Sequence, residues 1–189
     1  MRRLSRFAVL ATALVLPAPA ALADMRGGAV ELGVFAGSYH LTEEDEFDTR
    51  SYVSGFRIGL VITPEHELEF AYDSVQVEAF GVGLEDLESW NARYLFNFEA
   101  APGGRVVPYV GAGLGSVDDD FDAGGSDDDT QVSAFGGLRI FAGRTFCLRN
   151  EVAVKSFSTF GVDQSVVEFT AGVSWVVGGR ARRRPGQVY

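Results

Sequence analysis

The chain has 189 residues, 26 of them acidic and 16 basic, with a formal net charge of −10; this length suits a single domain. The acidic excess repels phosphate backbones and excludes nucleic acid as a partner. Cys147 is the only cysteine, so an internal disulfide and a cysteine-based metal site are excluded as well.

The first 23 residues have the layout of a secretory signal peptide. Three arginines precede an apolar run over residues 7–16, and the small-x-small sequence at 21–23 precedes Asp24. A membrane anchor is the alternative, but the 17 residues from 7 to 23 contain two prolines and fall short of the roughly 20 that a spanning helix needs. We therefore predict a signal peptide at 1–23, a folded domain at 24–178 and a short basic tail at 179–189.

After Asp24 the sequence alternates between apolar and polar residues with a period of two. In residues 50–62 one face carries Tyr52, Phe56, Ile58, Leu60 and Ile62, and the other carries glycines, valines and Arg57. The ranges 90–98 and 167–177 repeat this alternation, which is typical of β-strands and not of helices.

Eight such segments follow one another along the chain. We place them at 29–40, 50–62, 67–78, 89–99, 106–117, 131–142, 146–157 and 165–177. Short turns near 63–66, 101–104 and 142–145 alternate with longer polar connections at 41–49, 79–88, 118–130 and 158–164. The predicted fold class is all-β, an eight-stranded antiparallel up-and-down barrel that crosses a membrane.

A soluble lipocalin-like barrel would turn its apolar face inward, and two features favour the opposite arrangement. Aromatic residues lie near strand ends, at Tyr52, Trp90, Phe98 and Trp175, where they resemble the girdles that flank a lipid-facing band. The acidic excess lies in the predicted loops at 41–49 and 118–130. Both features indicate apolar side chains facing lipid.

The polar faces of the strands carry charges of both signs. They hold five acids (Glu31, Glu69, Asp73, Glu151 and Glu168) and five bases (Arg57, Arg93, Arg139, Arg149 and Lys155). Because unpaired buried charge is costly, this local balance indicates a closed interior in which the ten groups neutralise one another. The same register places Asn150 on the lipid side.

The sequence from Val107 to Gly115, VPYVGAGLG, resembles the fifth strand of the OmpA/OmpX-type small outer-membrane barrels. The signal peptide, the strand count and the closing strand agree with that resemblance. It implies a barrel in the outer membrane of a Gram-negative cell, with both termini in the periplasm and paired charges inside. Many OmpA relatives also carry a peptidoglycan-binding domain, for which residues 178–189 are too few.

Some outer-membrane barrels of this size resemble lipid A-modifying enzymes, which need a histidine, a serine and a carboxylate together. His40, Asp73 and Ser74 are the only set near one rim. However, the first and third strands are not neighbours and Ser74 faces lipid by register. His66 lies in a turn without an evident partner. We therefore assign no catalytic and no cofactor-binding residue.

Two charged segments suggest ligands. The aspartates at 118–129 invite a calcium site, because hard cations prefer carboxylate oxygens, but their spacing is not that of a calcium loop. We assign no metal site there; divalent ions bridging this loop to lipopolysaccharide phosphates are the alternative.

The arginines at 180–184 suit contact with anionic headgroups or peptidoglycan, and a disordered tail explains them equally well.

These observations predict a monomeric structural or surface-interaction protein. Its expected partners are outer-membrane lipid and lipopolysaccharide, without cofactor or nucleic acid. A lipid A-modifying enzyme and a narrow channel or small-ligand carrier are the alternatives. Phe35, Phe135 and Phe141 are expected to point inward, and eight strands enclose only enough room for side chains, which argues against a solute path.

Overall fold

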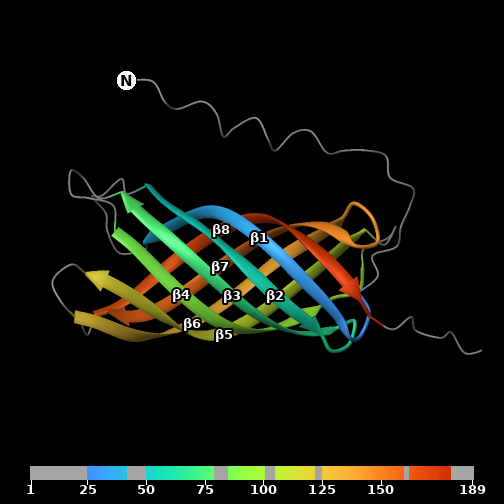
Figure 1. Ribbon diagram of the computed structural model, residues 1–189, viewed down its shortest axis with the longest axis horizontal. Helices are drawn as coiled ribbons and strands as arrows, with labels where there is room; N and C mark the ends of the chain where they lie inside the picture. The colour runs from blue at the N-terminus through green and yellow to red at the C-terminus, as the bar shows by residue number, and fades with distance from the viewer. Residues whose placement is uncertain are drawn as a thin grey trace, which may run out of the picture.

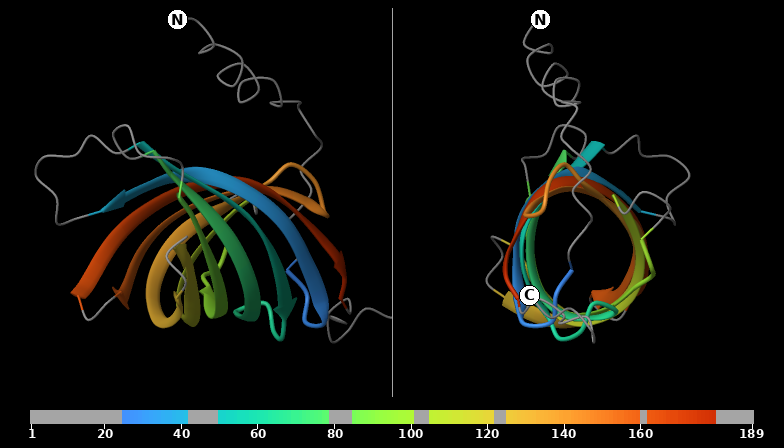
Figure 2. Two further views of the ribbon diagram at one scale, coloured as in Figure 1. Left: turned by 60° about the vertical axis from the view of Figure 1, so that its left-hand side comes forward. Right: turned by 90° about the vertical axis from the view of Figure 1, so that its right-hand side faces the viewer.

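The structure is a computed structural model that describes residues 25–41, 50–78, 85–100, 105–121, 125–159 and 162–179. The predicted signal peptide and the arginines of the predicted tail lie outside these residues. Eight antiparallel strands pair in chain order and close into a barrel, because β1 also pairs with β8 (Figure 1; Figure 2, right). The predicted fold is confirmed. Over the described part of the chain there is no helix able to span a bilayer.

The strands are β1 (Ala29–Leu41), β2 (Arg50–Val61), β3 (His66–Glu78), β4 (Glu85–Asn97), β5 (Val106–Phe121), β6 (Gly125–Phe141), β7 (Phe146–Thr159) and β8 (Val162–Gly178). The connections at 62–65 and 142–145 lie at one end, with the start of β1 and the finish of β8. We call this the turn end, on the right in Figure 1. The opposite end, where β1, β3, β5 and β7 finish and β2, β4, β6 and β8 begin, is the loop end.

Several strands extend further toward the loop end than predicted. β4 starts at Glu85, β5 continues to Phe121 and β6 begins at Gly125. The predicted loop at 118–130 is thus mostly strand, and the predicted contrast between long loops and short turns is wrong. Aspartates disfavour strands by themselves, but backbone pairing between β5 and β6 continues through Phe121↔Gly125 and supplies the hydrogen bonds that an isolated acidic segment would lack.

The two faces of the barrel wall follow the alternation of the sequence. Odd-numbered side chains point inward in β1 to β7, and even-numbered ones do so in β8. Large apolar side chains on the outer face, such as Leu114 and Tyr52, are 63% and 57% exposed. An exterior of this kind suits lipid and not water.

Three inward aromatic side chains each lie directly across from a glycine on the neighbouring strand. The pairs are Phe35↔Gly55, Phe135↔Gly111 and Tyr109↔Gly137. A Cβ added at Gly55 would come within 2.7 Å of the Phe35 ring, and one at Gly137 within 2.6 Å of Tyr109 Cζ. The glycines therefore provide the space that the rings fill in this narrow interior.

Candidate functional site

The interior has an apolar layer at each end. Met25 and Phe141 pack with Ala29, Val61, Val107, Cys147 and Val176 at the turn end. Phe35, Tyr39 and Phe157 pack with Val53, Val75, Val117 and Val166 toward the loop end. Charged side chains fill the space between these layers in two clusters.

The larger cluster holds four arginines and four glutamates (Arg57, Arg93, Arg139, Arg149, Glu31, Glu67, Glu69 and Glu151), all buried. Arg149 is its centre. The Arg149 guanidinium lies 3.2 Å from Glu31 and 2.9 Å from Glu151, and it also contacts Glu69. Its Nε donates to Tyr109 Oη over 2.8 Å. Tyr109 in turn donates to Glu151 over 2.7 Å. The phenol group therefore bridges the Arg149 guanidinium and the Glu151 carboxylate.

Arg93 and Arg139 extend this cluster on either side of Arg149. Arg93 contacts Glu151 at 2.6 Å and Glu69 at 3.2 Å. Arg139 contacts Glu31 at 3.0 Å and Glu67 at 2.8 Å, and it donates to Asn97 Oδ1. Arg57 has a longer contact of 3.5 Å with Glu151. Each guanidinium therefore has at least one carboxylate partner.

Glu67 is the charged interior residue that the sequence reasoning missed. Its side chain is fully buried and its Oε2 binds Arg139. The sequence did contain a signal for Glu67. Its residue number is odd, like those of Glu69 and Asp73, so it lies on the same inward face of β3, one residue after the strand begins. With Glu67 the described part of the interior has six acids and five bases in place of the predicted five of each.

The smaller cluster lies nearer the loop end and contains one cation and two carboxylates. Lys155 Nζ lies 2.8 Å from Asp73 Oδ2 and 2.7 Å from Glu168 Oε2. A polar chain continues from Asp73, which accepts from Ser89 over 2.8 Å. Asn91 then donates to Ser89, and Gln131 donates to Asn91.

Aromatic rings stack on the arginines of the larger cluster. The guanidinium carbon of Arg93 lies 3.6 Å from the Phe135 ring centre, and that of Arg57 lies 4.3 Å from the Phe35 ring centre. Such contacts help to hold a planar cation where water is excluded. The stacked rings and the ion pairs fill the mid-barrel interior, so the described side chains leave no wide path along it.

The structure places all ten sequence-predicted interior charges in these two clusters: Glu31, Arg57, Glu69, Asp73, Arg93, Arg139, Arg149, Glu151, Lys155 and Glu168. Asn150 is exposed on the outer face. No cluster of three or more possible metal ligands occurs among the described residues.

The histidines do not form the site that an enzyme of this kind would need. Asp73 is buried inside and binds Lys155, whereas Ser74 has the opposite parity and lies on the outer face. His40 is on β1, where its ring lies 6.3 Å from that of Phe169, and β2 separates β1 from β3. His66 does have a partner, contrary to expectation, because its Nδ1 is 2.6 Å from Tyr94 Oη.

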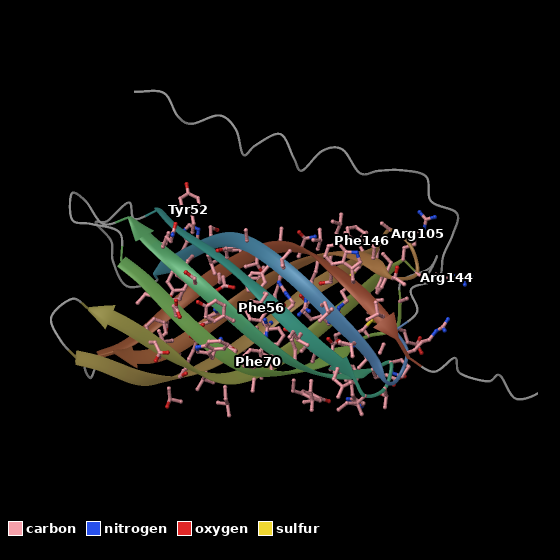
Figure 3. The ribbon with its side chains drawn as sticks, viewed as in Figure 1. Tyr52, Phe56, Phe70, Arg105, Arg144 and Phe146 are labelled. Atoms are coloured by element: carbon pink, nitrogen blue, oxygen red, sulfur yellow. The ribbon has the colours of Figure 1, made fainter. Side chains whose placement is uncertain are left out.

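Aromatic side chains form a patch on the outer face of β2 to β4. The Phe56 and Tyr72 rings lie 5.4 Å apart, and the Tyr72 and Trp90 rings 4.5 Å apart. In Figure 3, Phe56 and Phe70 mark this patch, Tyr52 lies toward the loop end, and Arg105 and Arg144 lie at the turn end. Apolar and aromatic residues thus cover the middle of the barrel.

The hairpin of β5 and β6 continues past this apolar surface at the loop end. Beyond Leu114↔Val132 most residues of both strands are polar, and pairing runs from Ser116↔Thr130 to Phe121↔Gly125. β6 pairs with β7 only up to Gln131↔Phe157. In the described chain, the β6 edge from 125 to 130 therefore has no strand partner. We call residues 116–121 and 125–130 the projecting hairpin (Figure 1, lower left).

The sequence matches the family of the OprF membrane domain over residues 7–180. The chain belongs to this family. Together with the apolar exterior, this membership establishes an outer-membrane β-barrel protein of the Gram-negative envelope. No match was found among curated proteins.

Solved structures share the fold of this OprF-family barrel. The N-terminal barrel of Pseudomonas aeruginosa OprF is 19% identical, with 80% of this chain and 99% of that chain covered and a TM-score of 0.52. Neisserial surface protein A is 16% identical, with 78% and 98% covered and a TM-score of 0.60. Ail of Yersinia pestis in complex with the heparin analogue sucrose octasulfate is 12% identical, with 80% and 99% covered and a TM-score of 0.54.

Proposed function

We propose that this protein is a surface-interaction protein whose projecting hairpin binds cationic, extended polypeptide segments outside the cell. The barrel anchors the hairpin in outer-membrane lipid as a monomer, with both termini in the periplasm. The observation that carries the proposal is the β6 edge at 125–130, which pairs with no further strand in the described chain, beside an aspartate-rich sequence. The filled interior supports a role at the surface in preference to a channel.

Charge and backbone geometry suggest the same kind of partner. Residues 118–129 contain seven aspartates and no basic residue, so their field attracts cationic segments. An unpaired strand edge offers N–H and C=O groups to a further strand, a recognised way of binding extended peptides. Ail has been crystallised with a heparin analogue, an anionic ligand. The negative charge of the projecting hairpin instead favours a positively charged partner.

The orientation can be tested with two cysteine variants in intact cells. Ser126→Cys, in the projecting hairpin, should react with a membrane-impermeant maleimide in whole cells. Gly143→Cys, in a turn with open space around its Cβ position, should react only after the outer membrane is permeabilised. Cys147 is buried and contributes little background. The reverse labelling pattern would disprove the orientation and the proposed function with it.

The partner chemistry can be tested with a lysine-rich peptide of alternating sequence and purified barrel in detergent. Replacing Asp127, Asp128 and Asp129 by asparagine should weaken binding about threefold or more, because a surface charge pair contributes roughly 0.2–1 kcal/mol and three are removed. The matched control replaces Glu43, Glu44 and Asp45 by their amides, which removes the same charge from another loop and should change binding less than twofold.

A second peptide separates strand addition from simple charge attraction. N-methylation of alternate residues keeps every charge but removes the amide hydrogens along one edge of the peptide. Binding should fall about tenfold or more, because several backbone hydrogen bonds are lost at once. Equal binding of both peptides would contradict strand addition and leave only an electrostatic contact.

A further inference from the structure

A small cavity lies between the two ion clusters. It has a volume of about 10 Å³ and is lined by residues of both, including Arg93 and Glu151 from the larger and Lys155 and Glu168 from the smaller cluster. Phe35 and Phe135 form its apolar walls. This volume is close to the minimum that one water molecule requires, and it is too small for an organic ligand.

Three polar atoms on the side chains that line this cavity lack a hydrogen bond within the protein. They are Ser133 Oγ, Arg93 Nε and Glu168 Oε2, and each belongs to a residue that is at most 9% exposed. Glu168 Oε2 has the Lys155 ammonium as an ionic partner at 2.7 Å, and a carboxylate oxygen can accept a further hydrogen bond. A buried polar group without a partner costs about 1–3 kcal/mol, so Ser133 Oγ and Arg93 Nε call for an occupant that satisfies them.

The register of the strands brings the three residues near one another across neighbouring strands. Arg93 is paired with Gly113, and Gly113 with Ser133. A Cβ on Gly113 would lie 2.7 Å from Ser133 Oγ and 3.0 Å from Arg93 Cγ, so both side chains extend over this glycine. Ser133 is also paired with Lys155, the partner of Glu168.

We infer that this cavity binds a single water molecule that bridges the larger and smaller ion clusters. Water accepts a hydrogen bond from Arg93 Nε–H and donates one to Glu168 Oε2. It can either donate to or accept from the Ser133 hydroxyl. These are three partners of the right polarity, the usual number for a buried water. A metal cation would leave the Arg93 N–H opposed to another positive charge. The donor and acceptor set therefore selects water.

The site can be tested by water–protein cross-relaxation in NMR spectra of the detergent-solubilised protein, together with a high-resolution crystal structure. The wild type should show one long-lived water signal near Ser133, with density about 2.7–3.2 Å from the three atoms. Ser133→Val removes the hydroxyl and fills the space, and it should abolish this signal. Ser133→Ala keeps the space and two of the partners, and it should retain the signal.

A double-mutant cycle tests whether this water couples the clusters. Glu151→Gln changes only the larger cluster and Glu168→Gln only the smaller. Their combined effect on the unfolding constant should depart from additivity about fivefold, and by less than twofold in the Ser133→Val background. Heat-modifiable gel migration confirms that each variant forms the barrel.

The result that would overturn the inference is an absent water signal in folded wild-type protein, or density whose position depends on added Na⁺. Undiminished coupling in the Ser133→Val background would show that the clusters interact directly and not through this site. None of these outcomes bears on peptide binding at the projecting hairpin, so the two proposals fail separately.

Discussion

The two ion clusters lie in the same interior but differ in balance. The larger one pairs four arginines with four glutamates, and Arg149 alone contacts three of those carboxylates. The smaller one sets Lys155 against both Asp73 and Glu168. Among the described residues, the excess of one acid therefore lies beside Lys155 and not in the larger cluster.

The larger cluster is therefore neutral and the smaller one is not. Arg149 is held by three carboxylates and the Tyr109 phenol, so loss of a counter-charge there leaves a buried ion unpaired. In the smaller cluster Asp73 also accepts from Ser89, and the polar chain continues through Asn91 and Gln131, whose dipoles can stabilise an uneven charge. The larger cluster should accordingly tolerate substitution less well than the smaller.

The largest effect is expected at Arg149. Arg149→Met leaves Glu31, Glu69 and Glu151 without their shared cation, and breaking a buried ion pair in this way costs about 3–5 kcal/mol. Urea unfolding in detergent micelles, followed by tryptophan fluorescence, measures the loss. Arg144→Met, at an exposed turn (Figure 3), is the control and should change stability by less than about 0.5 kcal/mol. Equal losses of unfolding free energy in the two variants would show that Arg149 is not the centre of the larger cluster.

A direct comparison of the clusters uses two isosteric changes. Glu151→Gln removes a charge from the balanced cluster and should cost about 3 kcal/mol. Glu168→Gln removes the excess charge from the smaller cluster, and it should cost about 1 kcal/mol or less because Asp73 still neutralises Lys155. The same unfolding measurement applies. If Glu168→Gln proved the more damaging change, the view that charge balance sets this difference would be wrong.

The aromatic contribution to the larger cluster can be tested at two adjacent glycines. A Cβ at Gly137 would press on Tyr109, which links Arg149 to Glu151, so Gly137→Ala should cost about 1–3 kcal/mol through overpacking. Gly136 points away from the interior, and the nearest atom to its Cβ position is 3.5 Å away. Gly136→Ala should therefore be close to neutral in the same assay, and comparable losses at both sites would point to a general strand effect.

The smallest effect is expected at Ser89. Its hydroxyl donates to Asp73 in the smaller cluster, so Ser89→Ala removes one hydrogen bond and should cost about 1 kcal/mol. Differential scanning calorimetry of the micellar protein would register a lowering of Tm of a few degrees. A loss as large as that of Glu151→Gln would show that the polar chain, and not charge balance, holds the smaller cluster.

Much of this architecture could be predicted because strand alternation has a period of two. Whether a residue number is odd or even decides which face of the strand the side chain occupies, and this alone separates Arg93 and Glu151 from Trp90 and Val152. The interior charges could therefore be named from the sequence. Glu67 was missed although it lies on the same strand face as Glu69, because the predicted strand begins at that residue and the observed one begins at His66. The aspartates of the projecting hairpin were expected in a loop because aspartate disfavours strands, and backbone pairing between β5 and β6 overrides that preference.

Other features could not have been read from the sequence. Arg149 and Glu69 are 80 residues apart, and their contact depends on how far each strand is shifted against the next around the closed barrel. The contact of His66 with Tyr94 arises from the same cross-strand register. The cavity near Ser133 depends on the rotamers of six or more side chains at once, and no linear pattern encodes that.

The unpaired β6 edge has a consequence for crowding in the membrane. Two copies that met edge to edge would set the aspartates at 127–129 of one against those of the other, so like charges oppose lateral association into continuous sheets. This repulsion acts over about 8 Å at physiological ionic strength. Concentrated salt or divalent cations should weaken it, and barrels reconstituted at high density should then aggregate through this edge.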